Sequence, residues 1–377
     1  MIKVIDLFSG CGGFSVGFKK TGYYNVIKAV EFDKVIAKSY AYNHPETQMI
    51  NQDIKNIDNE NYFLRNEADV IIGGPPCQGF SMAGARIRNG FIDDERNYLF
   101  RHYFNIVKLV RPKIFIMENV KGILNLKNGS IFEEIKRVFS DSNNFDGDRY
   151  FLNYVVVNAK DYGVPQSRER VIIVGVLNQN IDLTKFISET KNFIQRNDQH
   201  FFEKFTVKDA IGNLPLPTTD GVCHNIISDN HYLDFLKSDN GITYNHIATK
   251  HSQIAINRIK QIKIDENFKV LEEEINSVHS GAYGRLNYDG IAQTITTRFD
   301  TPSGGKFIHP EQDRTLTPRE AARIQGFPDS FKFIGNKTSI CKQIGNAVPI
   351  KISYFYGMLV RRILDVCFNQ GTFRETK

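Results

Sequence analysis

The sequence predicts an α/β fold, a doubly wound α/β domain joined to a second, smaller and irregular domain. Over about the first 176 residues, short apolar runs alternate with helical stretches, which is the pattern of βαβ units. A glycine-rich turn follows the first run, a layout that lets backbone approach a ligand closely at a helix N-terminus. From Leu177 to about Val278 the chain becomes polar and loses clear periodicity, which indicates the second domain.

Length, charge and cysteine content narrow the class of protein. The 377 residues suggest two domains, and 41% hydrophobic residues suffice for a packed core. The net charge of +6 is a mild excess, compatible with nucleic-acid binding. Five scattered cysteines without a C-x-x-C pair argue against a disulfide framework or a metal site. No signal peptide is visible and no apolar run reaches the ~18 residues of a membrane span, so we expect a soluble, cytoplasmic protein.

The first βα unit carries a candidate cofactor turn. Ile2–Leu7 is expected to be a strand, residues 8–14 a glycine-rich turn and Val16–Lys20 a helix. A second strand, Val26–Val30, ends at Glu31, where a carboxylate can hydrogen-bond a ribose hydroxyl pair. Because the spacing G-x-G-x-x-G is absent, a nucleoside-type cofactor such as S-adenosyl-L-methionine is favoured over NAD. Many α/β folds use such a turn for packing alone.

A cysteine lies at the tip of a rigid turn. The apolar run Ala68–Ile72 leads as a short buried strand into Gly-Gly-Pro-Pro-Cys-Gln-Gly-Phe-Ser, residues 73–81. Pro75 and Pro76 stiffen this turn because proline fixes φ and has no N–H. The thiol of Cys77 can act as a covalent nucleophile where its surroundings favour the thiolate. The alternative is a small buried cysteine in a tight turn.

A long polar stretch of mixed charge, Met82–Arg96, follows this turn. It is long enough to close over a site as a lid, with Arg86 and Arg88 placed to meet phosphates. The alternative is a solvated surface loop. A helix is expected to begin at residues 97–100 and to run to about Val110.

Further polar candidates lie at the ends of later strands. Lys113–Met117 reads as a strand that ends at Glu118, and a glutamate in this place faces the ligand crevice of an open α/β sheet. A Gln-x-Arg-x-Arg pattern places Gln166, Arg168 and Arg170 on one side of an extended segment, or on a solvated charged edge. The segments expected to be strands on either side of this pattern are Tyr150–Asn158 and Val171–Val176.

Three helices are predicted in the remainder of the chain. His251–Ile264 mixes isoleucines with basic residues, as a helix lying by DNA or a solvated helix would. Thr317 as N-cap, Pro318 at the first position and Glu320 at the third form a strong helix start. A final helix is predicted from Gln343 to about Val366.

Taken in order, these stretches resemble the motif set of the cytosine-C5 DNA methyltransferases. The resemblance runs from Lys3 to about Pro349 and includes Pro-Pro-Cys-Gln, Glu-Asn-Val and Gln-x-Arg-x-Arg. It implies a Rossmann-like methyltransferase domain at 1–176 plus 330–377 that binds S-adenosyl-L-methionine, and a target-recognition domain at 177–329. The cofactor-binding residues that it implies are Phe8, Ser9, Gly10, Gly13, Glu31, Asp53, Ile54, Leu99, Asn346 and Val348.

The cofactor residues differ in how well local structure alone explains them. The resemblance implies that Asp53 contacts the adenine amino group and that Ile54 packs on the ring, but a helix-capping aspartate is a common alternative. Packing explains Leu99 equally well. The resemblance also implies that the last helix returns to the first domain, where Asn346 and Val348 complete the cofactor pocket.

The catalytic residues implied by the resemblance are Cys77, Glu118, Arg168 and Arg170. Attack by the Cys77 thiolate on cytosine C6 produces an enamine whose C5 accepts a methyl group. A protonated Glu118 would donate its proton to the cytosine N3, and Arg170 would donate a hydrogen bond to the cytosine O2. Arg168 would support Arg170. No side chain is an obvious base for the C5 proton, so water is the candidate. A stacked cytosine is out of reach and must be flipped out of the duplex. The DNA-binding candidates are Gln78, Ser81, Arg86 and Arg88.

Three functions compete. The first is a monomeric modification enzyme that acts on double-stranded DNA, with a cognate restriction endonuclease acting separately. The second is a transfer-RNA cytosine-C5 methyltransferase, which the large variable region disfavours because sequence-specific reading of DNA needs a dedicated surface. The third is a catalytically silent DNA-binding regulator, which the presence of Cys77, Glu118 and Arg170 disfavours. The first is preferred.

Overall fold

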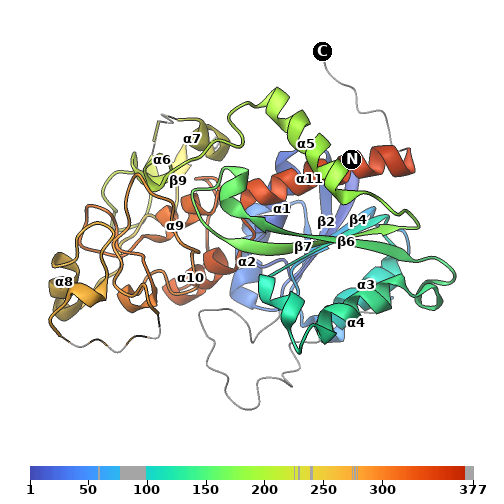
Figure 1. Cartoon of the computed structure of the whole chain (residues 1–377), viewed down its shortest axis with the longest axis horizontal. Coiled ribbons are helices and arrows are strands. Elements are labelled where there is room, and N and C mark those ends of the chain that lie inside the picture. Colours follow the sequence, from blue (N-terminus) through green and yellow to red (C-terminus); the bar gives the residue numbers. More distant parts are fainter. Residues whose placement is uncertain are drawn as a thin grey trace. The chain divides into compact units, whose positions relative to one another are not determined.

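The computed structural model describes residues 1–57, 60–76, 99–224, 226–227, 230–237, 241–273, 275, 277 and 279–369. They form two compact units (Figure 1). Unit 1 comprises residues 1–157, 169–198 and the chain from 352 onward, and unit 2 comprises 158–168 and 199–351. These units differ from the predicted domains, since 330–351 lies in unit 2 and 177–198 lies in unit 1.

Unit 1 is built on a seven-stranded sheet in the order β3-β2-β1-β4-β5-β7-β6. The first five strands in this order are parallel to one another, and β7 runs antiparallel to β5. The central strands β4 and β5 are buried along their whole length and apolar up to Glu118 and Asn119 at the end of β5, as expected for parallel strands with both faces covered. The predicted doubly wound α/β fold is therefore confirmed. The strands are β1 Ile2–Leu7, β2 Tyr24–Val30, β3 Gln48–Ile50, β4 Val70–Gly73, β5 Ile114–Asn119, β6 Tyr150–Asn158 and β7 Glu169–Leu177.

Helices cover both faces of this sheet (Figure 1). On one face, α3 and α4 bury aromatic and aliphatic side chains against Ile71, Phe115 and Ile173 of the strands. On the other, α1 packs so closely on α11 that a Cβ on Gly17 would lie 2.5 Å from the Ser353 side chain. The helices of unit 1 are α1 Gly13–Lys20, α2 Lys34–Asn43, α3 Phe100–Val110, α4 Ser130–Ser140, α5 Leu183–Asn197 and most of α11 Ile350–Phe368; its short 3₁₀ turns are η1 Ile54–Asn56, η5 Lys121–Asn125 and η6 Ser142–Phe145.

Unit 2 has short helices and long irregular segments, as the loss of periodicity indicates. A two-stranded ribbon pairs β8 with β9. The predicted helix start at Thr317 is confirmed: its hydroxyl accepts from the Glu320 N–H, and the Glu320 side chain accepts from the Thr317 N–H. The elements are η7 Ala159–Tyr162, α6 Val207–Ile211, β8 Cys223–His224, α7 His231–Leu236, β9 Ile242–Thr243, α8 Gln253–Lys260, η8 Phe268–Val270, η9 Pro302–Gly304, α9 Pro318–Ile324 and α10 Lys337–Asn346.

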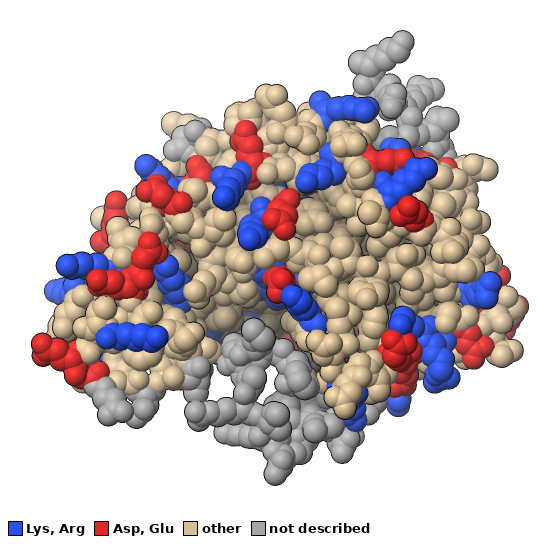
Figure 2. Space-filling model, in the orientation of Figure 1, with Lys and Arg blue, Asp and Glu red and all other residues tan. Residues whose placement is uncertain are grey.

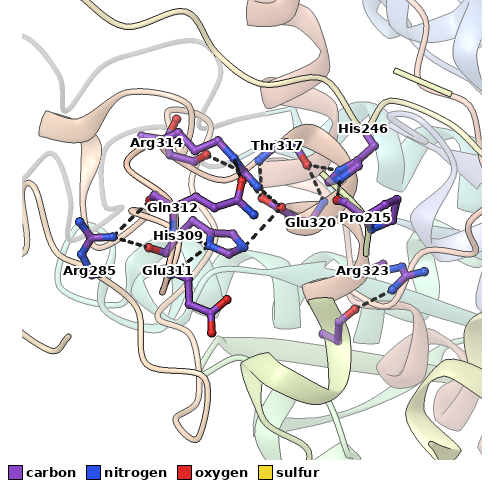
Figure 3. A network of polar contacts seen from close by, with 12 residues as sticks. Pro215, His246, Arg285, His309, Glu311, Gln312, Arg314, Thr317, Glu320 and Arg323 are labelled. Carbon is purple, nitrogen blue, oxygen red and sulfur yellow. Dashed lines mark hydrogen bonds and ion pairs between the residues drawn. The ribbon is translucent and has the colours of Figure 1, made fainter. Parts of the chain in front are cut away.

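A buried polar network surrounds the start of α9 (Figure 3). The Glu320 carboxylate accepts two hydrogen bonds from the Arg314 guanidinium, at 2.6 and 2.8 Å. His309 lies 3.8 Å from the same carboxylate. His246 links the Thr317 hydroxyl to a backbone carbonyl upstream in the chain. Because this region has little regular structure, side chains supply hydrogen-bond partners to buried polar groups that a sheet would otherwise pair with one another.

The predicted single helix from Gln343 is wrong. Helix α10 ends at Asn346 and α11 begins at Ile350, with Ala347 in an extended conformation between them. Pro349 explains the break, because it has no N–H to donate to the Gly345 carbonyl four residues earlier. That carbonyl instead accepts a hydrogen bond from Arg168, 2.8 Å away.

The predicted basic helix at 251–264 is shorter in the structure, where α8 spans Gln253–Lys260. Arg258 on α8 pairs with both carboxylate oxygens of Glu273, at 2.6 and 2.7 Å. Figure 2 shows acidic and basic side chains interspersed over the described part of the face drawn. A role for α8 beside DNA stays a prediction.

Candidate active site

The candidate site of unit 1 lies at the carboxyl edge of the central strands. Leu7 at the end of β1 pairs with Gly73 at the end of β4, which in turn pairs with Met117 of β5. The segments that follow these three strands therefore emerge side by side. They are the glycine turn after β1, the Gly-Pro-Pro segment after β4 and Glu118-Asn119 at the end of β5.

The glycine turn after β1 is sharply bent. Phe8 has a positive φ of 56°, which is rare for a bulky side chain and costs on the order of 1–3 kcal/mol. Gly12 has a φ of 101° and caps α1, and a Cβ there would lie 2.5 Å from the His44 ring. A Cβ on Gly10 would meet nothing within 4 Å, so the backbone borders open space at this point. Ser9 ties the turn to β2 through its N–H, 2.9 Å from the Val30 carbonyl, and Gly13 begins α1.

Glu31 connects this turn to the end of β2. One oxygen of its carboxylate accepts from the Gly10 N–H at 3.0 Å, and the other accepts from the Asp33 N–H at 2.7 Å. Burial raises the pKa of this carboxyl, and the two backbone hydrogen bonds oppose that shift. The structure thus places Glu31 directly beside Gly10, as the cofactor prediction requires, with lone pairs left for further donors.

The other predicted cofactor residues of unit 1 have clear local roles. Asp53 caps η1, since its carboxylate accepts from the Lys55 N–H at 3.0 Å, which is the capping alternative stated above. Ile54 is buried, and Leu99 packs against the core at the start of α3. Phe32 was not predicted as a site residue, although it directly follows Glu31; in the structure it is 71% exposed. The signal in the sequence was an aromatic residue next to a candidate ribose-binding carboxylate.

Glu118 and Arg170 form an ion pair at this edge. Arg170 Nε lies 2.8 Å from Glu118 Oε1, and both side chains are largely buried. Apart from this ion pair, the described residues give this buried oxygen no hydrogen-bond partner. Burial lowers the pKa of the Arg170 guanidinium, and the Glu118 charge opposes that shift. The pair therefore offers a ligand a guanidinium that can donate hydrogen bonds and a carboxylate oxygen that can accept one.

The chain that leads to Cys77 is held against the same pair. Asn119 donates from Nδ2 to the Pro75 carbonyl at 2.8 Å. A Cβ on Gly74 would lie 3.1 Å from Glu118 Oε2, so the bare glycine allows this close approach. Asn119 was not predicted as a site residue, because this hydrogen bond joins it to a carbonyl 44 residues earlier in the chain. Cys77, Gln78, Ser81, Arg86 and Arg88 lie outside the described residues.

The remaining predicted site residues lie in unit 2. Arg168 is 1% exposed, and its guanidinium donates to the carbonyls of Ile295, Gly345 and Ala347, at 3.0, 2.8 and 3.2 Å. Two of these carbonyls flank Asn346, which is itself exposed. Arg168 thereby fixes the backbone on both sides of Asn346. Val348 is buried two residues further on.

Among the described residues, no group of three or more His, Cys, Asp and Glu side chains could hold a metal ion. No described helix combines the length and apolar character needed to cross a membrane.

Comparisons with known proteins agree with the geometry. Residues 2–359 match the family model of the C-5 cytosine-specific DNA methylases. The Type II methyltransferase M.DdeI of Desulfomicrobium norvegicum is 34% identical over 92% of this chain and 86% of its own length. M.NgoPII of Neisseria gonorrhoeae, also a Type II methyltransferase, is 34% identical over 97% of this chain and 96% of its own.

Solved structures show the same fold. A proposed DNA modification methyltransferase encoded within a prophage (E. coli) has a TM-score of 0.72 at 29% identity, covering 97% of this chain and 100% of that one. The Dnmt2 methyltransferase of S. pombe has a TM-score of 0.59 at 16% identity, covering 96% of this chain and 99% of that one. At this identity the similarity is evidence for the fold only. The resemblance seen in the sequence is therefore confirmed, and the chain belongs to the C-5 cytosine-specific DNA methylases.

Proposed function

We propose that this methyltransferase transfers the methyl group of S-adenosyl-L-methionine to C5 of a cytosine within a short double-stranded DNA sequence, as the modification enzyme of a restriction-modification system. The observation that carries the proposal is the Glu118–Arg170 pair, 2.8 Å apart at the edge that also bears the glycine turn. The Type II names of the curated relatives support the restriction-modification context.

The residues at the edge of unit 1 fit a nucleoside cofactor. Open space beside Gly10 allows a ligand to approach the backbone, and Glu31 offers free lone pairs to the two hydroxyls of a ribose. Phe32 presents an exposed ring face next to them. Asp53 and Ile54 follow β3, the strand beside β2. S-adenosyl-L-methionine, when bound, supplies an electrophilic methyl group on a sulfonium. The chain's task is to hold it and to prepare the cytosine.

Cys77 and Glu118 would prepare the cytosine. The Cys77 thiolate would form a bond to C6, and the π electrons of the C5–C6 double bond would shift toward C5 and, through the ring, toward N3. A proton shared between Glu118 and N3 stabilises the charge that develops there. C5 would then accept the methyl group that S-adenosyl-L-methionine supplies, and S-adenosyl-L-homocysteine would be the leaving group. Loss of the C5 proton to water and departure of the Cys77 thiolate from C6 would restore the aromatic ring.

The two arginines of the Gln-x-Arg-x-Arg pattern take different roles in this proposal. Arg170 holds Glu118 and donates to the cytosine O2, because its guanidinium lies at the carboxylate and retains other N–H groups. Arg168 instead positions the backbone around Asn346 through three carbonyl hydrogen bonds. We retain Asn346 and Val348 as residues that complete the cofactor site.

DNA binding completes the proposal. The target cytosine must leave the stacked duplex before C6 can be reached, so flipping is required. Gln78, Ser81, Arg86 and Arg88 are proposed to hold the opened DNA, and unit 2 to read its sequence. One active site requires one chain, so we propose a monomer, with any cognate endonuclease acting separately.

The test is methyl transfer from labelled S-adenosyl-L-methionine to mixed-sequence duplex DNA, followed by bisulfite sequencing. We expect label at C5 of cytosines in one short context. Cys77→Ser should abolish transfer, Glu118→Gln should slow it by at least about 100-fold, and Cys367→Ser should leave it unchanged. Label on transfer RNA in place of DNA would overturn the DNA assignment, and full activity of Cys77→Ser would overturn the covalent mechanism.

A further inference from the structure

We propose that Asn51 is a positioning residue that sets the spacing between the ribose and adenine parts of the cofactor site. The inference rests on the proposed binding of S-adenosyl-L-methionine. Asn51 follows the last residue of β3 and lies two residues before Asp53. Its side chain is exposed, so neither core packing nor burial explains the contacts that it makes.

The Asn51 amide grips the turn that carries Glu31. Its Nδ2 donates to the Glu31 carbonyl at 2.9 Å and to the Phe32 carbonyl at 3.1 Å. Both neighbours can only accept, so the NH₂ end of the amide must face them and both of its hydrogens are used. Two consecutive carbonyls held by one planar group leave the peptide between them little freedom to rotate.

The same turn is also held from its inner side. The Glu31 carboxylate accepts from the N–H groups of Gly10 and Asp33. Asp33 in turn caps α2 by accepting from the N–H groups of Val35 and Ile36. Phe32 remains 71% exposed in a turn that is fixed on both sides. A rigid turn that presents an exposed ring and a carboxylate is suited to hold a ligand rather than to pack the protein.

Asn51 links two elements that would contact different parts of one nucleoside. The turn to which Asn51 is hydrogen-bonded carries Glu31, which would contact the ribose. The segment that contains Asn51 carries Asp53 and Ile54, which would contact the adenine. Asp53 cannot be displaced easily, because its carboxylate caps η1. The pair of hydrogen bonds from Asn51 therefore sets the distance between the two subsites in advance, which reduces the ordering that binding would otherwise require.

The experiment compares Asn51→Ala and Asn51→Asp with the unmodified full-length chain. Calorimetry would measure the affinity for S-adenosylhomocysteine and for adenosine alone, and kinetics would measure kcat and both KM values. Without the two hydrogen bonds the turn must be ordered when a ligand binds, which predicts affinities about five- to tenfold weaker for both ligands. The same factor should appear in KM for S-adenosyl-L-methionine, with kcat and KM for DNA unchanged. Asn51→Asp should be at least as weak, because a carboxylate cannot donate to two carbonyls.

Asn197→Ala is the matched control. Asn197 is an exposed asparagine of unit 1 whose amide also donates to a backbone carbonyl, that of Phe193 at 2.8 Å, on helix α5. It should leave every binding constant unchanged. Asn51→Gln keeps the amide at a longer reach and should recover part of the lost affinity.

Three outcomes would overturn the inference. One is unchanged affinity for both ligands in Asn51→Ala. Another is a loss of kcat without a change in KM for S-adenosyl-L-methionine. The third is loss of the cooperative thermal unfolding of ligand-free Asn51→Ala, which would show that Asn51 holds the fold as a whole and not the two subsites. Failure of the proposed function looks different, since the unmodified chain itself would then bind no S-adenosylhomocysteine.

Discussion

The two units are stabilised in different ways. Unit 1 satisfies its backbone through the ladder of a seven-stranded sheet and buries apolar side chains on both faces. Unit 2 has a ribbon of two short strands and small helices, and buried arginines donate to its backbone carbonyls. The buried arginines of unit 2 are Arg168, Arg285, Arg314, Arg319 and Arg323.

The difference follows from what an irregular backbone leaves unpaired. A loop that is buried still carries carbonyl groups, and each one without a partner costs about 1–3 kcal/mol. A guanidinium has five N–H donors in a rigid plane and can satisfy several carbonyls from different segments at once. Arg285 does this, donating to the carbonyls of Ile259, Ile262 and His309. Unit 2 therefore depends on single side chains where unit 1 depends on a shared ladder.

The largest effect is expected when one such arginine is removed. Arg319 is fully buried and donates to the carbonyls of Tyr244, Pro328 and Phe331. Arg319→Ala removes the hydrogen bonds that these three carbonyls accept from the buried guanidinium and should lower the free energy of unfolding by about 3–5 kcal/mol. Arg319→Lys should recover little, because an ammonium lacks the planar fork. Urea denaturation measures the loss.

Hydrogen exchange of Arg319→Ala then tests the comparison itself. Protection should fall in the segments of unit 2 that Arg319 joins, and the sheet of unit 1 should keep its protection. Equal loss of protection across both units would show that the two are not stabilised separately.

The next effect is a loss of stability in acid. His309 Nδ1 accepts from the N–H groups of Glu311 and Gln312, so the folded state has no room for a proton there. Burial lowers the pKa of His309 to about 4, against the opposing charge of Glu320. The unfolded histidine titrates near 6.5, so it binds a proton that the folded one refuses. Stability should fall as pH drops from about 7 to 4, by up to about 3 kcal/mol.

His309→Asn is the variant that isolates this effect. Its side-chain oxygen can accept from the same two N–H groups but does not titrate. The stability of the variant, measured by urea denaturation at several pH values, should change less between pH 7 and 4. An unaltered slope would assign the acid sensitivity elsewhere, and His44 of unit 1, whose pKa burial lowers to about 3, is the next group to replace.

The contrast between the units also explains what the sequence could reveal. The strands of unit 1 leave a local pattern of apolar runs, and the capping residues Thr317 and Glu320 are three positions apart, so both were predictable. Hydrogen bonds from Arg168 to Ile295 and Gly345 join positions more than 120 residues apart and leave no local pattern. The hydrogen bonds of the Asn51 amide, to carbonyls 19 and 20 residues earlier, leave no local pattern either.

The candidate site divides along the same line. Glu118 and Arg170 could be named because each stands in a recognisable motif, and the structure brings them together. The role of Asn119 could not be read from composition or spacing, since it depends on a carbonyl 44 residues earlier. The break before α11 was missed because the effect of Pro349 on the helix was overlooked.

A smaller effect is expected from overpacking the sheet of unit 1. Gly175 on β7 lies opposite Phe115 on β5, and a Cβ there would lie 2.1 Å from the Phe115 ring. Gly175→Ala should cost about 1–3 kcal/mol, because the ring must shift within a closely packed core. Adding Phe115→Leu should make the alanine less costly, which a double-mutant cycle in urea would measure. Full additivity would show that the ring moves freely.

The smallest effect is expected from an arginine of unit 1 that is not buried. Arg101 on α3 donates to Glu134 on α4 at 2.8 and 3.1 Å, but its side chain is 54% exposed. Water solvates both groups when the pair is lost, so Arg101→Ala should change the free energy of unfolding by no more than about 0.5 kcal/mol. That change should disappear at 1 M salt, where the screening length is about 3 Å. A loss as large as that of Arg319→Ala would mean that burial and carbonyl partners do not determine what an arginine contributes here.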